Sequence, residues 1–597
     1  MNRLRYLVLA AVCLIVPANT VWSAPVPGAR SGLEQIPETA PVVIHVRGVQ
    51  GVHDRLVALM KLALPDLLDK YKDQIDDFFE KGPDNALKGR KLRGLAKDGP
   101  LFFALLELPK VGDSGEPKMA FILTVTDYKE FVENILTEEE RKNAKDEGNG
   151  IKSASIDNKQ TYLVDRKGYA VVTQDKDVAE SFTKKITGLH AKMNKDLASK
   201  LLSSDLGLYV NMDAVYKEYG EQIKQAKQGI QQAIDFGAAA AEESQKQFVE
   251  LAKKAINPIF QAIEDMQSLL LTFELRQGGL ALHLQSEVKD DSPTEALLHD
   301  ARPIDFEELG RLPRDRAYYL GMKASAGMYK SLSSLMSSLP TGGTKDAGDL
   351  MKELAKAGPN VLLSSGSFPS AGLDVSRFDD PAKAVAATLK MYQTMDPAAN
   401  DLKEKPDVKP DAEKFGDFKL HAVQLKMDLE KMAEKAAANA KADDETKKQL
   451  VKAMKGFVGE KKSIWFGTDG KTFVTVTAPD WSSASKLLEQ YSKNAEAAHE
   501  VKAFSDARKE MPKQTSFLVL LDAVRMFGRI LEAVKPMIPS GQVPAGWPKL
   551  PGKGTSAYLG LSATLQPQRG SFDVFITAAA AQEFYKAVIQ PLVGGGE

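Results

Sequence analysis

Residues 162–173 read Tyr-Leu-Val-Asp-Arg-Lys-Gly-Tyr-Ala-Val-Val-Thr, and residues 464–476 read Ile-Trp-Phe-Gly-Thr-Asp-Gly-Lys-Thr-Phe-Val-Thr-Val. Each stretch predicts two β-strands, rich in β-branched and aromatic residues and joined at a turn that contains glycine. Asp469-Gly470 is a strong two-residue turn signal. A helical pattern follows each stretch, around Val178–Lys185 and from Trp481. Strands that turn back on themselves favour antiparallel sheets over a parallel, doubly wound fold.

The segments around these two hairpins also correspond in order, which predicts an internal duplication. The matched strand and helix segments are 42–46 with 317–322, 121–125 with 371–375, 208–212 with 518–521, and the closing hairpins 271–284 with 558–576. Asp-Ala-Val follows the third strand pair at 213–215 and at 522–524. We therefore expect an α+β protein of two similar domains, residues 24–305 and 306–597. Each should be a mainly antiparallel sheet with helices packed on one face.

The N-terminus predicts a signal peptide over residues 1–23. Arg3 and Arg5 precede an apolar stretch of about a dozen residues, which is too short to span a bilayer. Val21-Trp22-Ser23 offers a cleavage site, although Trp22 leaves a retained signal anchor as the alternative. We expect an exported protein, periplasmic or extracellular.

Cysteine usage narrows the chemistry further. Cys13 is the single cysteine and lies inside the predicted signal, so the mature chain would contain no disulfide and no thiol nucleophile. Val12 directly before it argues against a lipoprotein signal. An exported domain of this kind must rely on its hydrophobic core, and 597 residues are enough for two or more domains.

The charge balance excludes one class of partner. The 79 Lys and Arg residues are matched by 80 Asp and Glu residues, which gives a net charge of −1. No basic excess is present to bind phosphates, so we predict no nucleic-acid partner. No run after the signal approaches the length of a transmembrane segment.

Insertions distinguish the two halves, and functional segments are often found in insertions on a scaffold. We predict a long helical region at 216–269, interrupted at Pro258, and a Lys/Ala-rich helix at about 429–457 whose charged face could simply be solvated. The remaining insertions read as a proline-rich loop at 535–554 and polar loops at 340–348 and 402–413.

One short segment resembles the surroundings of the nucleophilic serine in trypsin-like proteases. It reads Gly-Asp-Ser-Gly-Glu-Pro at 112–117, and Glu116 departs from that family, which has glycine there. A catalytic triad needs a histidine and an aspartate that converge on the serine. Only His45 and His53 precede it in the chain. Because the segment lies between two predicted strands, we interpret it as a hairpin loop.

Other candidate groups also have structural explanations. None of the seven histidines pairs with another at the spacing of one helix face, and His45 and His283 fall in apolar strands. Gly48 and Gly51 could hold an anion at a helix N-terminus, but two glycines are weak evidence. The segment 341–345 lacks the glycine spacing of a phosphate-binding loop.

The repeated acids Asp213 and Asp522 follow strands and open helices, so we predict that both are helix N-caps. No catalytic, cofactor-binding or metal-binding residue is therefore predicted, and no cofactor.

The segment Thr-Val-Thr-Asp-Tyr-Lys-Glu-Phe at 124–131 and the strand–Asp-Ala-Val turns resemble parts of large exported bacterial proteins of unknown function that carry a duplicated α+β module. The resemblance covers most of the mature chain but is architectural. It implies a similar domain organisation and brings no substrate or catalytic residue.

Three functions remain open at this point. The leading hypothesis is a non-enzymatic exported protein that serves binding or assembly in the cell envelope, with an unknown protein or an apolar ligand as its partner. The first alternative is a periplasmic carrier of a lipid or other apolar ligand, because helices rich in Leu, Met and Ala over antiparallel sheets can leave a cavity. The second alternative is an unrecognised hydrolase.

Overall fold

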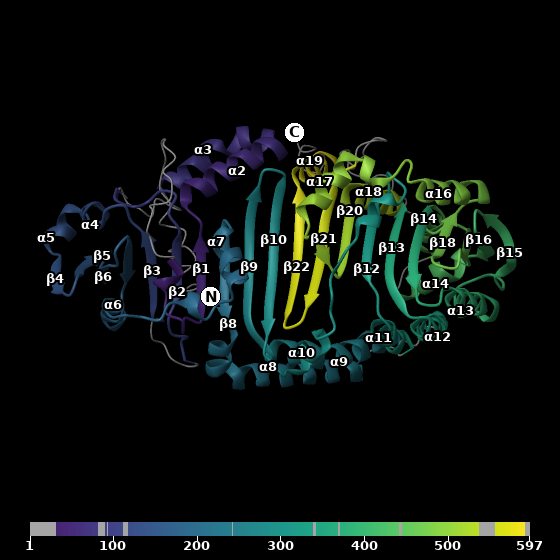
Figure 1. Cartoon of the computed structure of the whole chain (residues 1–597), viewed down its shortest axis with the longest axis horizontal. Coiled ribbons are helices and arrows are strands. Elements are labelled where there is room, and N and C mark those ends of the chain that lie inside the picture. Colours follow the sequence, from purple (N-terminus) through teal and green to yellow (C-terminus); the bar gives the residue numbers. More distant parts are fainter. Residues whose placement is uncertain are drawn as a thin grey trace. The chain divides into compact units, whose positions relative to one another are not determined.

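The computed structural model describes residues 32–81, 90–91, 93–110, 117–240, 243–337, 342–367, 371–440, 444–535 and 556–590 (Figure 1). The chain divides into two compact units. The first comprises residues 1–227, 262–296 and 568–571, and the second comprises residues 228–261, 297–567 and 572–597. The predicted signal peptide and Cys13 lie outside the described residues.

The first unit is built on an antiparallel sheet. Its strands are β1 (Val42–Val46), β2 (Leu101–Leu105), β3 (Met119–Thr124), β4 (Lys145–Gly148), β5 (Ile151–Ile156), β6 (Lys159–Asp165), β7 (Tyr169–Thr173), β8 (Leu206–Asn211), β9 (Met266–Arg276) and β10 (Gly279–Val288). Their pairings give the order 4-5-6-7-3-2-1-8-9-10, and each of these pairings is antiparallel. The N-terminal strand β1 thus lies inside the sheet, between β2 and β8.

Helices cover parts of both faces of this sheet. The helices of this unit are η1 (Gly32–Glu34), α2 (Val49–Ala63), α3 (Pro65–Lys81), α4 (Tyr128–Ile135), α5 (Glu138–Lys142), α6 (Lys176–Thr183), η3 (Leu189–Ala191) and α7 (Lys195–Ser203). Three more, α8 (Met212–Ala240), α9 (Glu243–Glu264) and α10 (Pro293–Leu298), are divided between the units, because residues 228–261 and 297–298 belong to the second. Phe131 of α4 packs with Leu123 on one face, whereas Phe182 of α6 and Leu201 of α7 pack with Ile122 on the other. Because β3 has buried apolar side chains on both faces, helices on one face alone would leave the side chains on the other face exposed.

The second unit is also built on antiparallel strands. They are β12 (Tyr318–Lys323), β13 (Pro359–Ser367), β14 (Ala371–Phe378), β15 (Asp407–Phe415), β16 (Phe418–Lys426), β17 (Lys461–Thr468), β18 (Phe473–Ala478), β20 (Phe517–Asp522), β21 (Tyr558–Gln566) and β22 (Arg569–Thr577). Up to β21 the pairings give the order 15-16-17-18-14-13-12-20-21. A small separate sheet joins β11 (Ile304–Asp305) to β19 (Gln514–Thr515). The predicted α+β class with mainly antiparallel sheets is confirmed.

The helices of the second unit again lie on both sides of the strands. They are η4 (Glu307–Arg311), α11 (Ala326–Ser337), α12 (Gly342–Lys356), α13 (Pro381–Thr394), α14 (Leu429–Ala440), α15 (Asp444–Phe457), α16 (Trp481–Lys493), η5 (Ala498–Glu500), α17 (Lys502–Glu510), α18 (Ala523–Val534), α19 (Ala578–Phe584) and η7 (Tyr585–Ile589). One core joins Ala384 of α13 to Phe466 and Phe473. Another joins Phe504 of α17 to Tyr319 and Tyr558.

The two hairpins expected from the sequence are present. They are β6–β7 and β17–β18, which form antiparallel pairs. Gly168 and Gly470 have φ angles of 94° and 90° in their turns, a conformation that glycine adopts without steric cost. In the second turn the Asp469 side chain accepts hydrogen bonds from the backbone N–H groups of Lys471 and Thr472.

Several local expectations were wrong. Helix α9 continues through Pro258, since proline removes a single backbone donor and the flanking turns hold the helix. The predicted helical region also ends early, because β9 already begins at Met266. The expected loop at 340–348 forms the start of α12 from Gly342.

The expected polar loop at 402–413 is wrong as well, because β15 begins at Asp407. This strand is mostly polar, with Val408, Ala412 and Phe415 as its apolar members, so it shows no strict alternation of apolar and polar residues by which to recognise it. The Lys/Ala-rich segment 429–457 contains two helices, α14 and α15, rather than one. Of the proline-rich loop, residues 536–554 lie outside the described residues.

Candidate functional site

A row of apolar side chains crosses the sheet of the first unit. Residues directly opposite one another in antiparallel strands share a face. By the strand register, Leu284, Leu271, Leu208, Ile44, Phe103 and Phe121 are successive neighbours across β10, β9, β8, β1, β2 and β3. We call these six residues the first-unit row.

The first-unit row is open to solvent at one end. Leu271 and Leu284 are 43% and 39% exposed, and Leu206, which is opposite Phe273 in the adjacent row, is 47% exposed. On the reverse face of the same strands, Tyr209 and Leu270 are buried. Contiguous exposed apolar surface of this kind is a mark of a binding site.

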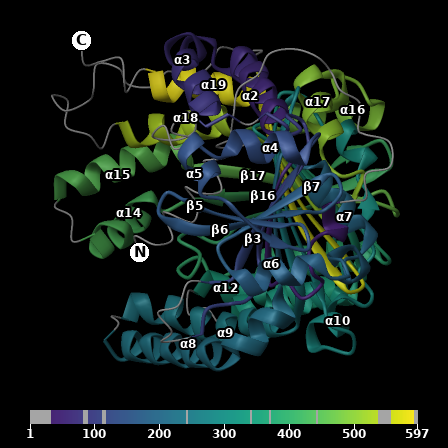
Figure 2. The ribbon, with the colours of Figure 1, turned by 90° about the vertical axis from the view of Figure 1, so that its left-hand side faces the viewer.

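Helices lie beyond both ends of the strands that carry the first-unit row. Figures 1 and 2 both show α2 and α3 beyond one end of these strands and α8 beyond the other. Helix α7 packs on the reverse face, where its Leu197 and Leu201 contact the cluster that contains Tyr209. The exposed leucines therefore lie on the face opposite α7.

The second unit has an equivalent row with a different composition. Leu561, Val519, Leu320, Ser364 and Asp374 are successive neighbours across β21, β20, β12, β13 and β14. We call them the second-unit row. Its aliphatic members are only partly buried. When β12 is matched to β1, Ser364 and Asp374 stand where the first-unit row has Phe103 and Phe121.

The two residues at these matched positions interact differently in the two units. The rings of Phe103 and Phe121 lie with their centroids 5.2 Å apart. In the second unit the Ser364 hydroxyl donates a hydrogen bond of 2.5 Å to Oδ1 of Asp374, and it also lies 3.5 Å from the hydroxyl of Tyr318. Burial raises the pKa of the Asp374 carboxyl, while the Ser364 hydrogen bond and the charge of Lys462 oppose that rise.

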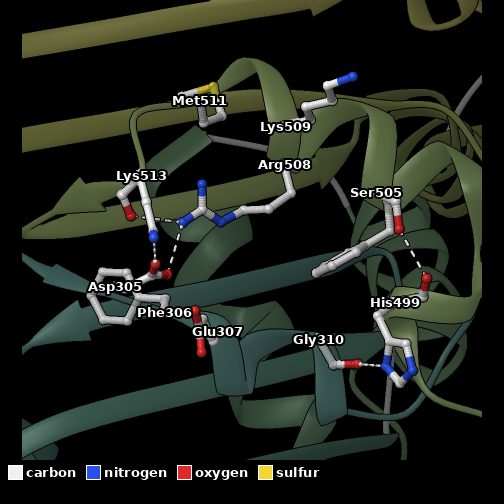
Figure 3. A pocket seen from close by; sticks show the side chains of 11 residues that line it. Asp305, Phe306, Glu307, Gly310, His499, Ser505, Arg508, Lys509, Met511 and Lys513 are labelled. Carbon is white, nitrogen blue, oxygen red and sulfur yellow. Dashed lines mark hydrogen bonds and ion pairs between the residues drawn. The ribbon is translucent and has the colours of Figure 1, made fainter.

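A separate pocket of about 430 Å³ lies on the α17 side of the second unit (Figure 3). Its charged groups are largely paired with one another. The Arg508 guanidinium donates to the carbonyls of Pro512 and Lys513 at 3.0 and 2.9 Å and pairs with Asp305 at 3.3 Å. His499 Nδ1 lies 2.9 Å from the Gly310 carbonyl, so it acts as a donor there.

This pocket does not contain a serine–histidine pair. The Ser505 hydroxyl donates to the backbone carbonyl of His499 at 2.9 Å and not to its imidazole (Figure 3). A base must be within hydrogen-bond reach of a nucleophile's proton to activate it. The contacts of Arg508 instead hold β11 and β19 to α17.

Replacing Arg508 with alanine should lower the free energy of unfolding of the second unit by about 2 kcal/mol, because it leaves two carbonyls without their donor and leaves Asp305 with the longer ion pair to Lys513, at 3.9 Å. The side chain is 18% exposed, so solvent screens it little. Urea denaturation checks this, with Lys509→Ala, an exposed neighbour on the same helix, as the control. Equal midpoints for both variants and the wild type would contradict it.

The prediction for the repeated acids holds at one position only. Asp522 caps α18 by accepting the Arg525 backbone N–H at 3.0 Å. In the first unit the cap is Asn211, which accepts from Ala214 N at 3.4 Å, and Asp213 lies inside the first turn of α8. Asp213 instead forms ion pairs with Lys192 and Lys289 at 3.6 and 3.8 Å. The helix begins directly after β8 ends, so Asn211 occupies the position of Asp522.

The other residues considered in the sequence do not gather at one place. His45 is fully buried against Phe102, with ring centroids 5.1 Å apart. His283 is half-buried on β10, where its Nε2 lies 3.2 Å from Oε1 of Gln285. Ser114 lies outside the described residues. Within the described ranges, no cluster of three His, Cys, Asp or Glu side chains is arranged to hold a metal ion.

Helix length and hydropathy complete the description of possible sites. In the part of the chain that the structure covers, no helix is both long and apolar enough to cross a membrane. Gly48, which the sequence suggested as part of an anion site, directly precedes α2 and, as a glycine, provides no side-chain cap.

Comparison with known proteins adds little. No protein-family model matches the chain, and no curated protein matches its sequence. Among solved structures, crystal forms I and III of TP0453 are similar at 10% and 9% identity over 46% of this chain and 88% and 89% of theirs. Both have a TM-score of 0.21, which carries no argument about fold or function. The resemblance to large exported bacterial proteins remains an interpretation of the sequence.

Proposed function

We propose that this protein is a non-enzymatic carrier, exported to the periplasm or beyond, that holds the hydrocarbon part of a lipid-like ligand against its sheets. The observation that carries the proposal is the contiguous set of leucines left exposed on the first-unit row and its neighbour, while the reverse face of the same strands is buried. This develops the apolar-ligand alternative considered from the sequence.

The dimensions and energies of the row suit a hydrocarbon chain. Strands are spaced about 4.8 Å apart, so the part of the row from β10 to β2 is about 19 Å long, which is of the order of a long acyl chain. Covering a largely exposed leucine contributes about 1 kcal/mol or more, at roughly 25 cal/mol per Å² of apolar surface. Several such residues together give useful affinity without any polar contact.

We also propose that the two halves of the chain, residues 24–305 and 306–597, arose by duplication. Support comes from the strand orders: with β12 matched to β1, the two orders correspond from one end up to β9 and β21. A duplicated carrier would offer two faces of related shape. Because the first-unit row has Phe103 and Phe121 where the second-unit row has Ser364 and Asp374, the two rows would prefer different ligands.

The test replaces exposed members of the first-unit row with charge. We expect the double change Leu271→Asp and Leu284→Asp to weaken binding of a fluorescent long-chain fatty acid at least tenfold, because a tenfold change corresponds to about 1.4 kcal/mol. Both side chains are exposed enough for the fold to tolerate the change.

The matched control is Leu297→Asp. Leu297 lies on α10, is not a member of the row and is 82% exposed, so this control introduces one aspartate, where the double variant introduces two, at a position outside the row. Titration of the purified protein by fluorescence measures all three forms. If the double variant binds the fatty acid as tightly as the control, the row is not the binding site.

A further inference from the structure

The polar pair of the second-unit row stands at a boundary in the sheet. On one side, α13 covers the strands, with Ala384 packed in a core that includes Phe378 and Phe466. On the other side, Leu320 and Val519 remain only partly buried. Asp374 therefore lies between the packed core and the half-exposed part of the same face.

The charges around Asp374 do not neutralise it. Among the described residues no Lys or Arg side chain forms an ion pair with it, although Lys462 of β17 acts on it at longer range. The other titratable groups facing it are Tyr318 of β12 and Tyr392 of α13, and burial together with the nearby Asp374 charge raises the pKa of Tyr392 to about 12. Oδ1 of Asp374 accepts a hydrogen bond from the Ser364 hydroxyl.

A partly desolvated carboxylate beside an apolar surface is complementary to one kind of ligand. A cation would restore the charge balance and form a charge-assisted hydrogen bond, which is about twice as strong as a neutral one. The ring of Tyr318, on the same face, could add a cation–π contact. The first unit has no carboxylate at the equivalent positions, because Phe103 and Phe121 occupy them, so its row should not favour a cationic headgroup.

We propose that the second-unit row binds an amphiphile with an ammonium headgroup, with the headgroup at Asp374 and the hydrocarbon chain along Leu320, Val519 and Leu561. The proposal rests on the carrier function above and adds the headgroup class. Ser364 is a positioning residue, because its hydrogen bond fixes Oδ1 and leaves Oδ2 for the ligand.

The experiment compares dodecylammonium, dodecanol and dodecyl sulfate by calorimetry with the full-length purified protein, below the micelle concentrations of the two ionic amphiphiles and below the solubility limit of dodecanol. We expect dodecylammonium to bind the wild type at least tenfold more tightly than dodecanol. Asp374→Asn should abolish that preference, so that the variant binds dodecylammonium and dodecanol about equally. Asp407→Asn, which alters a 55% exposed carboxylate on β15, is the control and should keep the preference.

The outcomes separate the two proposals. If none of the three amphiphiles binds the wild type, both the carrier function and this inference are wrong. If all bind and Asp374→Asn keeps the ammonium preference, only the headgroup assignment is wrong. Should Asp374→Asn fail to fold by circular dichroism, Asp374→Ser provides the same measurement, because serine also fits beside Ser364.

Discussion

Replacing Tyr319 with alanine should lower the free energy of unfolding of the second unit by about 4 kcal/mol, the usual cost of deleting a large buried aromatic side chain. Tyr319 has no exposed surface. Its ring meets those of Phe504 and Tyr558 edge-on, with centroids 4.9 and 5.6 Å away, and its hydroxyl donates to the Pro313 carbonyl at 2.9 Å. The cavity would lie between β12, β21 and α17, which cannot close without moving the sheet.

Tryptophan fluorescence during urea unfolding measures this effect. Trp465 and Trp481 lie in the second unit with ring centroids 5.8 Å apart, so their signal reports on that unit. Tyr319→Phe keeps the ring and loses only the hydroxyl, which donates to the Pro313 carbonyl and accepts from the Arg316 N–H at 3.3 Å, so it should cost about 1 kcal/mol. An alanine variant that is no less stable than the phenylalanine variant would show that the ring packing contributes little.

The first unit should lose about 3 kcal/mol of stability between pH 6.5 and pH 4 because of His45. Burial, and secondarily the charge of Arg47, lowers the pKa of His45 from 6.5 to about 4 in the folded protein. In this window the unfolded chain binds the proton and the folded one does not, so stability falls as pH falls. A difference of about 2.5 pKa units corresponds to about 3 kcal/mol, and below pH 4 the loss is complete.

Hydrogen exchange of the β1 amides at several pH values, corrected for intrinsic exchange rates, measures this dependence. His45→Leu removes the titrating group and should flatten the profile between pH 4 and 6.5. His190→Leu, at an exposed position in the same unit, should keep the slope of the wild type. A His45→Leu profile as steep as that of the wild type would place the acid sensitivity elsewhere.

Local patterns predicted those parts of the fold that local contacts determine. The hairpins β6–β7 and β17–β18 were predicted because the turn residues and both strands lie within about a dozen positions of one another. Asn211 was missed as the first-unit helix cap because the repeated Asp-Ala-Val suggested a match that is two residues out of register. Asn serves as well as Asp at a cap, so the sequence carried no signal to choose between them.

The candidate site depended on pairings that no local pattern specifies. Ile44 and Leu208 are neighbours although 164 positions separate them, and the row appears only once β1 is known to lie between β2 and β8. Asp374 did give a signal, since it alternates with the buried Leu373 and Val375 within one strand. What the sequence lacked was the fact that the other face of that strand is only partly covered.

The interior position of β1 has a consequence for how the chain emerges. Val42–Val46 is synthesised early, but its two neighbouring strands are residues 101–105 and 206–210. The backbone N–H and C=O groups on its two edges therefore stay unpaired until those later segments have been synthesised. Until then the nascent chain presents an unpaired, apolar strand, which is the kind of surface on which foreign strands pair. We therefore expect β1 to be exposed to pairing with other strands until β8 has been synthesised.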